Sequence, residues 1–174
     1  MARRDAEPQP GPAAQLRQLY KDNADIHIVE AAVDSKRMTR TLYTVDSDVL
    51  PNWAGGLASF DRQHLMRHEY LLPGIEEFIQ ELSVKCVPFD EIIESRPGQG
   101  RLNLLQIDAE GADGRILSLF PFDRLKPAIV HWETKNMTKL EQETALDLLC
   151  AHHYRVARSG EEDMLAVHND DFSA

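Results

Sequence analysis

Short β-rich runs and stretches with helical spacing alternate along most of the chain. Between Pro12 and Asn23 the apolar positions Ala13, Leu16 and Leu19 recur at helical spacing, which predicts a short amphipathic helix. The same reasoning predicts further helices at residues 61–68, 89–94, 113–120 and 138–152, and strands at residues 26–33, 38–45, 84–87, 102–107, 127–133, 154–158 and 164–168.

The order of these elements predicts an α/β protein whose early strands are parallel. The last two strands flank a turn-forming segment, which predicts an antiparallel edge. Residues 75–82 fit either a helical turn or the start of a strand, and residues 46–74 form a long loop around a short helix. We expect a single domain over residues 1–174, with residues 1–6 and 169–174 flexible.

One buried-looking run, from Leu102 to Ile107, ends abruptly in the acids Asp108 and Glu110 and in Gly111. Ligands of open α/β sheets bind at the carboxyl ends of the strands, so these acids are candidate site residues. The same acids also fit a turn residue followed by an acid near a helix N-terminus, where the helix dipole favours negative charge. The pattern alone leaves both interpretations open.

The charge of the chain narrows the classes of partner. A formal net charge of -10 argues against nucleic acid, because affinity for phosphate backbones comes from clustered lysines and arginines. No apolar run approaches the roughly 20 residues that span a bilayer, and the N-terminal residues lack the apolar core of a signal peptide. We therefore expect a soluble, cytoplasmic protein with a small-molecule partner and without a nucleic-acid or membrane partner.

The cysteines and histidines give little support to a disulfide or a metal site. Cys86 and Cys150 are far apart and belong to no Cys/His cluster, so we expect both to be small buried residues. His64 and His68 are four positions apart and could share a helix face as metal ligands. Because no third ligand is evident nearby, we expect no metal.

The run after Leu105 also carries a family resemblance. Residues 105–113 read Leu-Gln-Ile-Asp-Ala-Glu-Gly-Ala-Asp, and this hydrophobic-Asp-x-Glu-Gly-x-Asp pattern resembles the FkbM-type family of S-adenosylmethionine-dependent methyltransferases. The likeness extends over residues 7–167. Supporting matches lie at Glu7-Pro8, at residues 30–33 and 87–90, at residues 126–130 leading to Glu133, and at residues 151–156 and 163–166.

The resemblance implies a Rossmann-like class I methyltransferase fold that binds S-adenosylmethionine across the carboxyl ends of its first strands. In this family Glu7 would accept the ribose hydroxyls, while Ala32 and Val33 would border the adenine. Asp108 and Glu110 would face the methyl-transfer pocket, with Asp108 counted among both the cofactor-binding and the catalytic residues. Acids at that place can orient or deprotonate a hydroxyl nucleophile.

Glu133 is the third candidate catalytic acid, because it ends the β-rich run that follows. An ion pair with Lys135 explains an acid at that position equally well. The expected reaction is O-methylation of a hydroxyl on a sugar or another small metabolite. The alternatives are a truncated, non-catalytic α/β remnant or interaction module without cofactor binding and, more weakly, a different small-ligand enzyme that uses the two acids with a metal.

The chain departs from the family pattern at its start. The family's first strand and its glycine-rich turn would precede Glu7, yet only six residues do so, and no glycine occurs before Gly11. We therefore expect a sheet that lacks this strand and turn.

Overall fold

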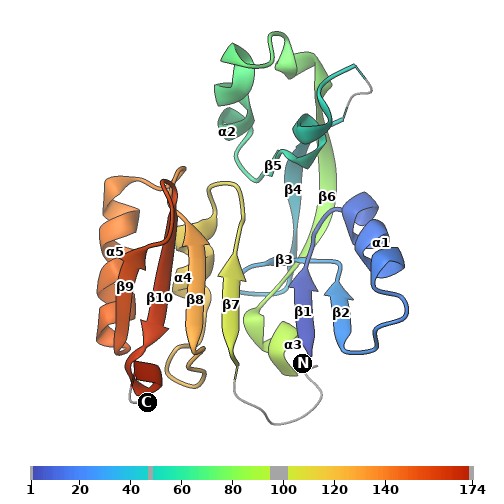
Figure 1. The fold of residues 1–174 in the computed structure, drawn as a ribbon. Coiled ribbons are helices and arrows are strands. Elements are labelled where there is room, and N and C mark those ends of the chain that lie inside the picture. The colour runs from blue at the N-terminus through green and yellow to red at the C-terminus, as the bar shows by residue number, and fades with distance from the viewer. Residues whose placement is uncertain (1, 47–48, 95–101, 173–174) are drawn as a thin grey trace. The chain divides into compact units, whose positions relative to one another are not determined.

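The chain forms two compact units. A computed structural model describes residues 2–46, 49–94 and 102–172, and these fall into a first unit within residues 1–99 and a second within residues 100–174 (Figure 1). The prediction of one domain over residues 1–174 stays a prediction.

The first unit begins with a strand, a helix and a second strand. Strand β1 (Arg3–Ala6) pairs in parallel with β2 (Ile26–Val29), and α1 (Pro10–Leu19) connects them. The proline at the start of α1 suits a first helical turn, where no amide hydrogen is needed. The predicted helix is thus confirmed, although it starts and ends earlier than expected.

Residues Arg3–Ala6 form a strand that the sequence pattern did not predict, while the expected flexibility of residues 1–6 stays a prediction. Arg3 donates its backbone N–H to the carbonyl of Asp25 at 2.8 Å, and its side chain pairs with Asp5 at 2.6 Å. This run consists mainly of charged residues and therefore carries no local strand signal. Its pairing with β2 determines its extended conformation. At the other end, Asn169–Phe172 form the 3-10 helix η4, while residues 1, 173 and 174 lie outside the described residues.

The single strand expected over residues 26–33 is divided in two. Ala31 donates its N–H to the Val29 carbonyl at 2.9 Å, which makes a tight turn after β2. The chain then forms β3 (Ala32–Val33), which pairs in parallel with Cys86 and Val87 in a different sheet.

That sheet has the strand order β3-β6-β4-β5. Strands β4 (Met38–Val45) and β6 (Ile79–Val87) run antiparallel along their full length, as Figure 1 shows, and β5 (Ala58–Ser59) pairs with β4. Residues 75–82 were expected to form either a helical turn or the start of a strand. They contain both, because the 3-10 helix η3 (Ile75–Phe78) is followed directly by the start of β6.

Short helices between β4 and β6 enclose a small core of their own. They are η1 (Asn52–Gly56), α2 (Arg62–Met66) and η2 (Arg67–Tyr70), so the helix expected at residues 61–68 is confirmed. Helix α3 (Phe89–Glu94) follows β6. The buried residues of this core are Val45, Ala54, Leu57, Leu65, Leu72 and Ile75.

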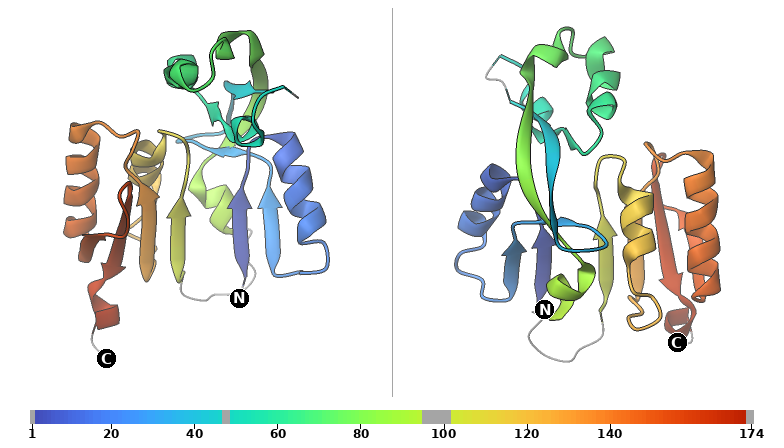
Figure 2. Two further views of the ribbon diagram at one scale, coloured as in Figure 1. Left: turned by 45° about the horizontal axis from the view of Figure 1, so that its top comes forward. Right: turned by 180° about the vertical axis from the view of Figure 1, so that it is seen from behind.

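The second unit contains a four-stranded sheet with the order β7-β8-β10-β9. Strands β7 (Leu104–Ile107) and β8 (Ile129–Glu133) are parallel, whereas β10 (Asp163–His168) is antiparallel to both β8 and β9 (Tyr154–Arg158). The predicted antiparallel edge is confirmed. Helices α4 (Asp113–Leu119) and α5 (Lys139–Ala151) pack against each other over one face of this sheet (Figure 2).

The core of the second unit lies between these helices and the sheet. Leu117, Val130, Leu149 and Ala166 are fully buried, and Trp132 is 1% exposed. The run that contains β7 was predicted to be buried, yet Leu104 is 44% exposed. The reason is that β7 lies at the edge of this sheet.

Two further expectations are tested by the burial of single residues. Cys86 is buried as expected, but the prediction for Cys150 is wrong, because it lies on an exposed position of α5.

No helix in the described parts of the chain has the length and apolar character needed to cross a membrane.

Candidate functional site

The loop after β7 is a tight turn with two residues in the left-handed region. Ala112 donates its N–H to the Ala109 carbonyl at 3.1 Å, and between them Glu110 has a φ of 45° and Gly111 a φ of 94°. Positive φ at both central positions defines a type I′ turn. Glycine adopts this conformation readily, whereas a glutamate in it is strained.

Asp113 anchors the turn from the start of α4. Its side chain is 1% exposed, and its Oδ2 accepts a hydrogen bond from the Gly111 N–H at 3.3 Å. Burial raises the pKa of Asp113, while the Gly111 N–H opposes this shift. Asp113 was not among the predicted site residues, although the family pattern contains it.

Four carboxylates of the second unit influence one another and form what we call the acidic cluster: Asp108, Glu110, Asp113 and Glu133. Burial raises the pKa of Glu110, and the charge of Asp108 raises it further. Burial likewise raises the pKa of Glu133, with additional contributions from the charges of the other three acids. Each of these two side chains therefore holds a proton more tightly than an ordinary glutamate.

Lys135 forms its ion pair with Glu162, whereas a pair with Glu133 was the alternative that the sequence left open. Its Nζ lies 3.0 Å from Glu162 Oε2, and this hydrogen bond raises the pKa of Lys135. The charge of Lys135 still lowers the pKa values of Glu110 and Glu133 slightly, against the larger effects that raise them. Glu133 thus remains available as a site acid.

Glu7 lies directly after β1. Its Oε1 accepts a hydrogen bond from the Gln9 N–H at 2.7 Å, and its own N–H donates to the Val29 carbonyl at 2.9 Å. Burial raises the pKa of Glu7, while the Gln9 N–H opposes the shift. Because Ala31 also donates to the Val29 carbonyl, the backbone of Glu7 lies close to the segment that leads into Ala32.

Ala32 and Val33 form β3 and lie beside a small apolar cluster. Ala32 is 7% exposed, and Val33 packs against the buried residues Ala31, Val87 and Ile92. The structure therefore brings Glu7, Ala32 and Val33 to neighbouring strand ends of the first unit. Asp108, Glu110 and Glu133 come together in the second unit.

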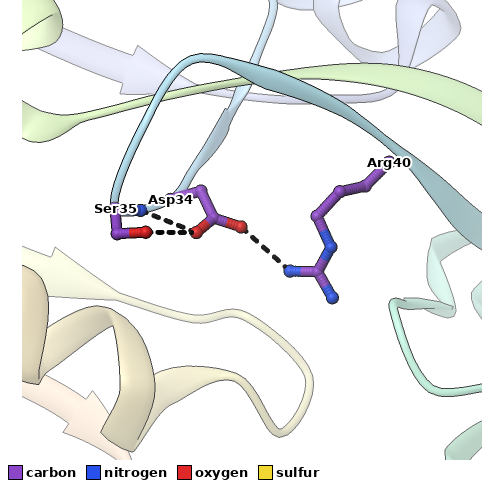
Figure 3. Close-up of polar contacts among 3 residues, drawn as sticks. All are labelled: Asp34, Ser35 and Arg40. Carbon is purple, nitrogen blue, oxygen red and sulfur yellow. Dashed lines mark hydrogen bonds and ion pairs between the residues drawn. The ribbon is translucent and has the colours of Figure 1, made fainter.

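Immediately after β3, Asp34, Ser35 and Arg40 form a polar cluster (Figure 3). Asp34 Oδ1 accepts hydrogen bonds from the Ser35 N–H at 2.6 Å and hydroxyl at 3.3 Å, and Asp34 Oδ2 lies 3.0 Å from Arg40 Nη1. The sequence indicated only a turn at Asp34 and Ser35. An aspartate followed by an arginine six positions later, at the start of a strand, was the available signal.

The two histidines considered as metal ligands are neighbours. The ring centroids of His64 and His68 are 6.0 Å apart, His64 is 5% exposed, and burial lowers the pKa of His64. Within residues 2–46, 49–94 and 102–172, no three His, Cys, Asp or Glu side chains are arranged to hold a metal ion.

Parallel strands joined through helices, with acids directly after the strands, define an α/β protein with a candidate ligand site at its strand ends. The chain belongs to the methyltransferase FkbM domain family, whose model matches residues 5–156. This confirms the resemblance seen in the sequence. No curated protein and no solved structure matches the chain.

Proposed function

We propose that the protein is an S-adenosylmethionine-dependent methyltransferase that methylates a hydroxyl oxygen of a sugar or another small metabolite. The observation that carries the proposal is the strained acidic turn after β7 in a chain of the FkbM family. The proposal includes a Rossmann-like class I arrangement of the strands. Backbone strain of this kind clusters at functional sites, where the rest of the fold holds it in place.

The acidic cluster provides groups that suit the acceptor side of the reaction. A general base works best when its pKa lies near the working pH, and burial raises the pKa values of Glu110 and Glu133 in that direction. In the proposed step the acceptor oxygen forms a bond to the methyl carbon, the carbon–sulfur bond breaks, and the hydroxyl proton passes to Glu110. Glu133 and Asp108 orient the hydroxyl.

The residues of the first unit fit the nucleoside part of the cofactor. S-adenosylmethionine supplies a methyl group on a positively charged sulfur. Glu7 Oε1 accepts a hydrogen bond from Gln9, and the described residues give its Oε2 no hydrogen bond, so this carboxylate can accept from ribose hydroxyls. Ala32 and Val33 are proposed to border the adenine, and Asp108 is proposed to contact the cofactor as well as the acceptor.

Calorimetric titration of the folded protein with S-adenosylmethionine tests the proposal. We expect saturable heat with one site per chain. The absence of detectable heat from a well-folded sample would overturn cofactor binding, and the non-catalytic alternative would then replace it. Transfer of a labelled methyl group to a panel of sugars and small hydroxyl compounds tests the acceptor class.

Two matched pairs of variants separate the proposed roles. Glu7→Gln should weaken cofactor binding by about tenfold or more, because it removes a charge-assisted hydrogen bond, and the exposed Glu81→Gln should not. Glu110→Gln should lower the rate of methyl transfer by about a hundredfold with cofactor affinity unchanged, as expected for loss of a general base. The exposed Glu143→Gln on α5 is its control.

A further inference from the structure

Arg40 connects two segments of the first unit that are far apart in sequence. Its Nη1 lies 3.0 Å from Asp34 Oδ2, and its guanidinium lies over the Phe60 ring at 4.1 Å from the ring centroid. The ion pair uses one edge of the planar group and the stacking uses its face. An arginine can make both contacts at once, whereas a lysine has neither the plane nor the second nitrogen.

The partner of Arg40 is a buried charge. Asp34 is 3% exposed, and its backbone N–H donates to the Val87 carbonyl at 2.9 Å, which ties it to the end of β6. A buried carboxylate needs a partner of opposite charge, and Arg40 provides one (Figure 3). The side chain of Asp34 is thereby fixed from Ser35 on one oxygen and from Arg40 on the other.

Strand β3 is held in its sheet by few backbone pairs. It contains only Ala32 and Val33, and among the described residues it pairs with β6 alone, at the edge of its sheet. Arg40, in contrast, lies on β4, which is in register with β6 from Met38 to Val45. The Asp34–Arg40 pair therefore connects the end of a short edge strand to a rigid one.

We propose that Arg40, acting through Asp34, is a positioning residue for the segment Ala32–Val33, which is proposed to border the adenine of the cofactor. This inference rests on the proposed function. Phe60 keeps the guanidinium in the orientation that Asp34 needs. Without Arg40, the end of β3 is free to shift, and a small shift of a binding surface is enough to reduce affinity.

Titration calorimetry with S-adenosylhomocysteine tests the inference on the full chain, comparing the wild type with Arg40→Met. We expect the dissociation constant to rise about tenfold, equivalent to about 1.4 kcal/mol, with the stoichiometry unchanged. Arg62→Met is the matched control, because it removes an arginine of the same unit from an exposed ion pair with Glu76 at 2.8 Å. Its dissociation constant should equal that of the wild type.

The stoichiometry separates positioning from a merely structural role. If Arg40→Met lowers the binding stoichiometry while the remaining sites keep the wild-type dissociation constant, Arg40 only supports folding and the inference is overturned. An unchanged dissociation constant and stoichiometry overturn it as well. If the wild type itself binds nothing, the proposed function fails first, which is a different result from a failure of the variant alone.

A second variant covers the case in which Arg40→Met does not fold. Arg40→Lys keeps a positive charge beside Asp34 but loses the planar stacking on Phe60. We expect it to fold and to bind S-adenosylhomocysteine several-fold more weakly than the wild type. Wild-type affinity in Arg40→Lys would show that charge neutralisation of Asp34 is all that Arg40 provides, and would overturn the positioning role.

Discussion

Replacing Glu110 should make the protein more stable, because both its backbone conformation and the burial of its charge are unfavourable. Its φ of 45° lies in the left-handed region, and burial beside Asp108 disfavours its charged form. A residue with a Cβ costs about 1–2 kcal/mol in this conformation, whereas glycine costs about 0.4–1 kcal/mol through the greater freedom of the unfolded chain. Glu110→Gly should therefore increase the free energy of unfolding by about 1 kcal/mol.

Glu110→Gln isolates the charge from the backbone, and its effect should depend on pH. The folded-state pKa of Glu110 is raised, so the folded protein binds the proton more tightly and the charged carboxylate destabilises it at neutral pH. Removing that charge from a partly exposed site should stabilise by about 0.5 kcal/mol at pH 7. The gain should shrink as the pH falls through the raised pKa and vanish below the ordinary value of 4.5, where both states are protonated.

Urea unfolding followed by the fluorescence of Trp132 measures these changes in the second unit. Trp132 is 1% exposed, and a Trp53→Phe background removes the other tryptophan. His153→Gly is the control for backbone strain, since His153 has a φ of 67° directly after the end of α5 and is exposed. It should stabilise by about 1 kcal/mol, because glycine is preferred at this position of a helix end.

Two outcomes would refute the reasoning. If His153→Gly stabilises the protein but Glu110→Gly does not, the turn after β7 is not strained at Glu110. If the gain of Glu110→Gln is as large at pH 4 as at pH 7, its origin is not the charge of the carboxylate.

Three further substitutions test other parts of the fold. Thr138→Ala should lower the free energy of unfolding by about 0.5–2 kcal/mol at pH 7, because it breaks the capping box with Glu141. The Thr138 backbone N–H and hydroxyl lower the pKa of Glu141, so this loss of stability, read from urea midpoints, should diminish as the pH falls through the lowered pKa. Gly74→Ala should destabilise the protein by about 1 kcal/mol, because Gly74 has a φ of 80°. Gly55 has as much free space around its Cα but no positive φ, so Gly55→Ala should not destabilise, and circular dichroism melting compares the two variants. Leu117→Ala, at a fully buried position of α4, should cost about 2–5 kcal/mol in the same urea assay.

Local signals predicted the elements whose structure depends on neighbouring residues. Thr138 and Glu141 have capping-box spacing, and the box forms at the start of α5. The acids after Ile107 were expected at a strand end, and they follow β7 there. The antiparallel pair that closes the chain was predicted from two β-rich runs around a turn-forming segment.

Non-local pairing accounts for what the sequence pattern missed. Residues 3–6 look like an exposed charged segment, and only their pairing with β2 makes them a strand. The division of residues 26–33 depends on β6, which offers a second partner more than 50 positions away. For the site, the sequence indicated Glu110 and Glu133 separately, but the parallel pairing of β7 with β8 is what brings their charges into one cluster.

The turn after β7 suggests why these acids are there. A type I′ turn is most stable with Asn-Gly at its centre, and the chain has the glycine in the second position. The first position holds a glutamate, which is strained, and its charge is repelled by Asp108. Asparagine would avoid both effects, so stability does not explain Glu110. A carboxylate whose pKa is raised suits proton transfer from a hydroxyl, and that chemistry accounts for a residue that the fold alone would not favour.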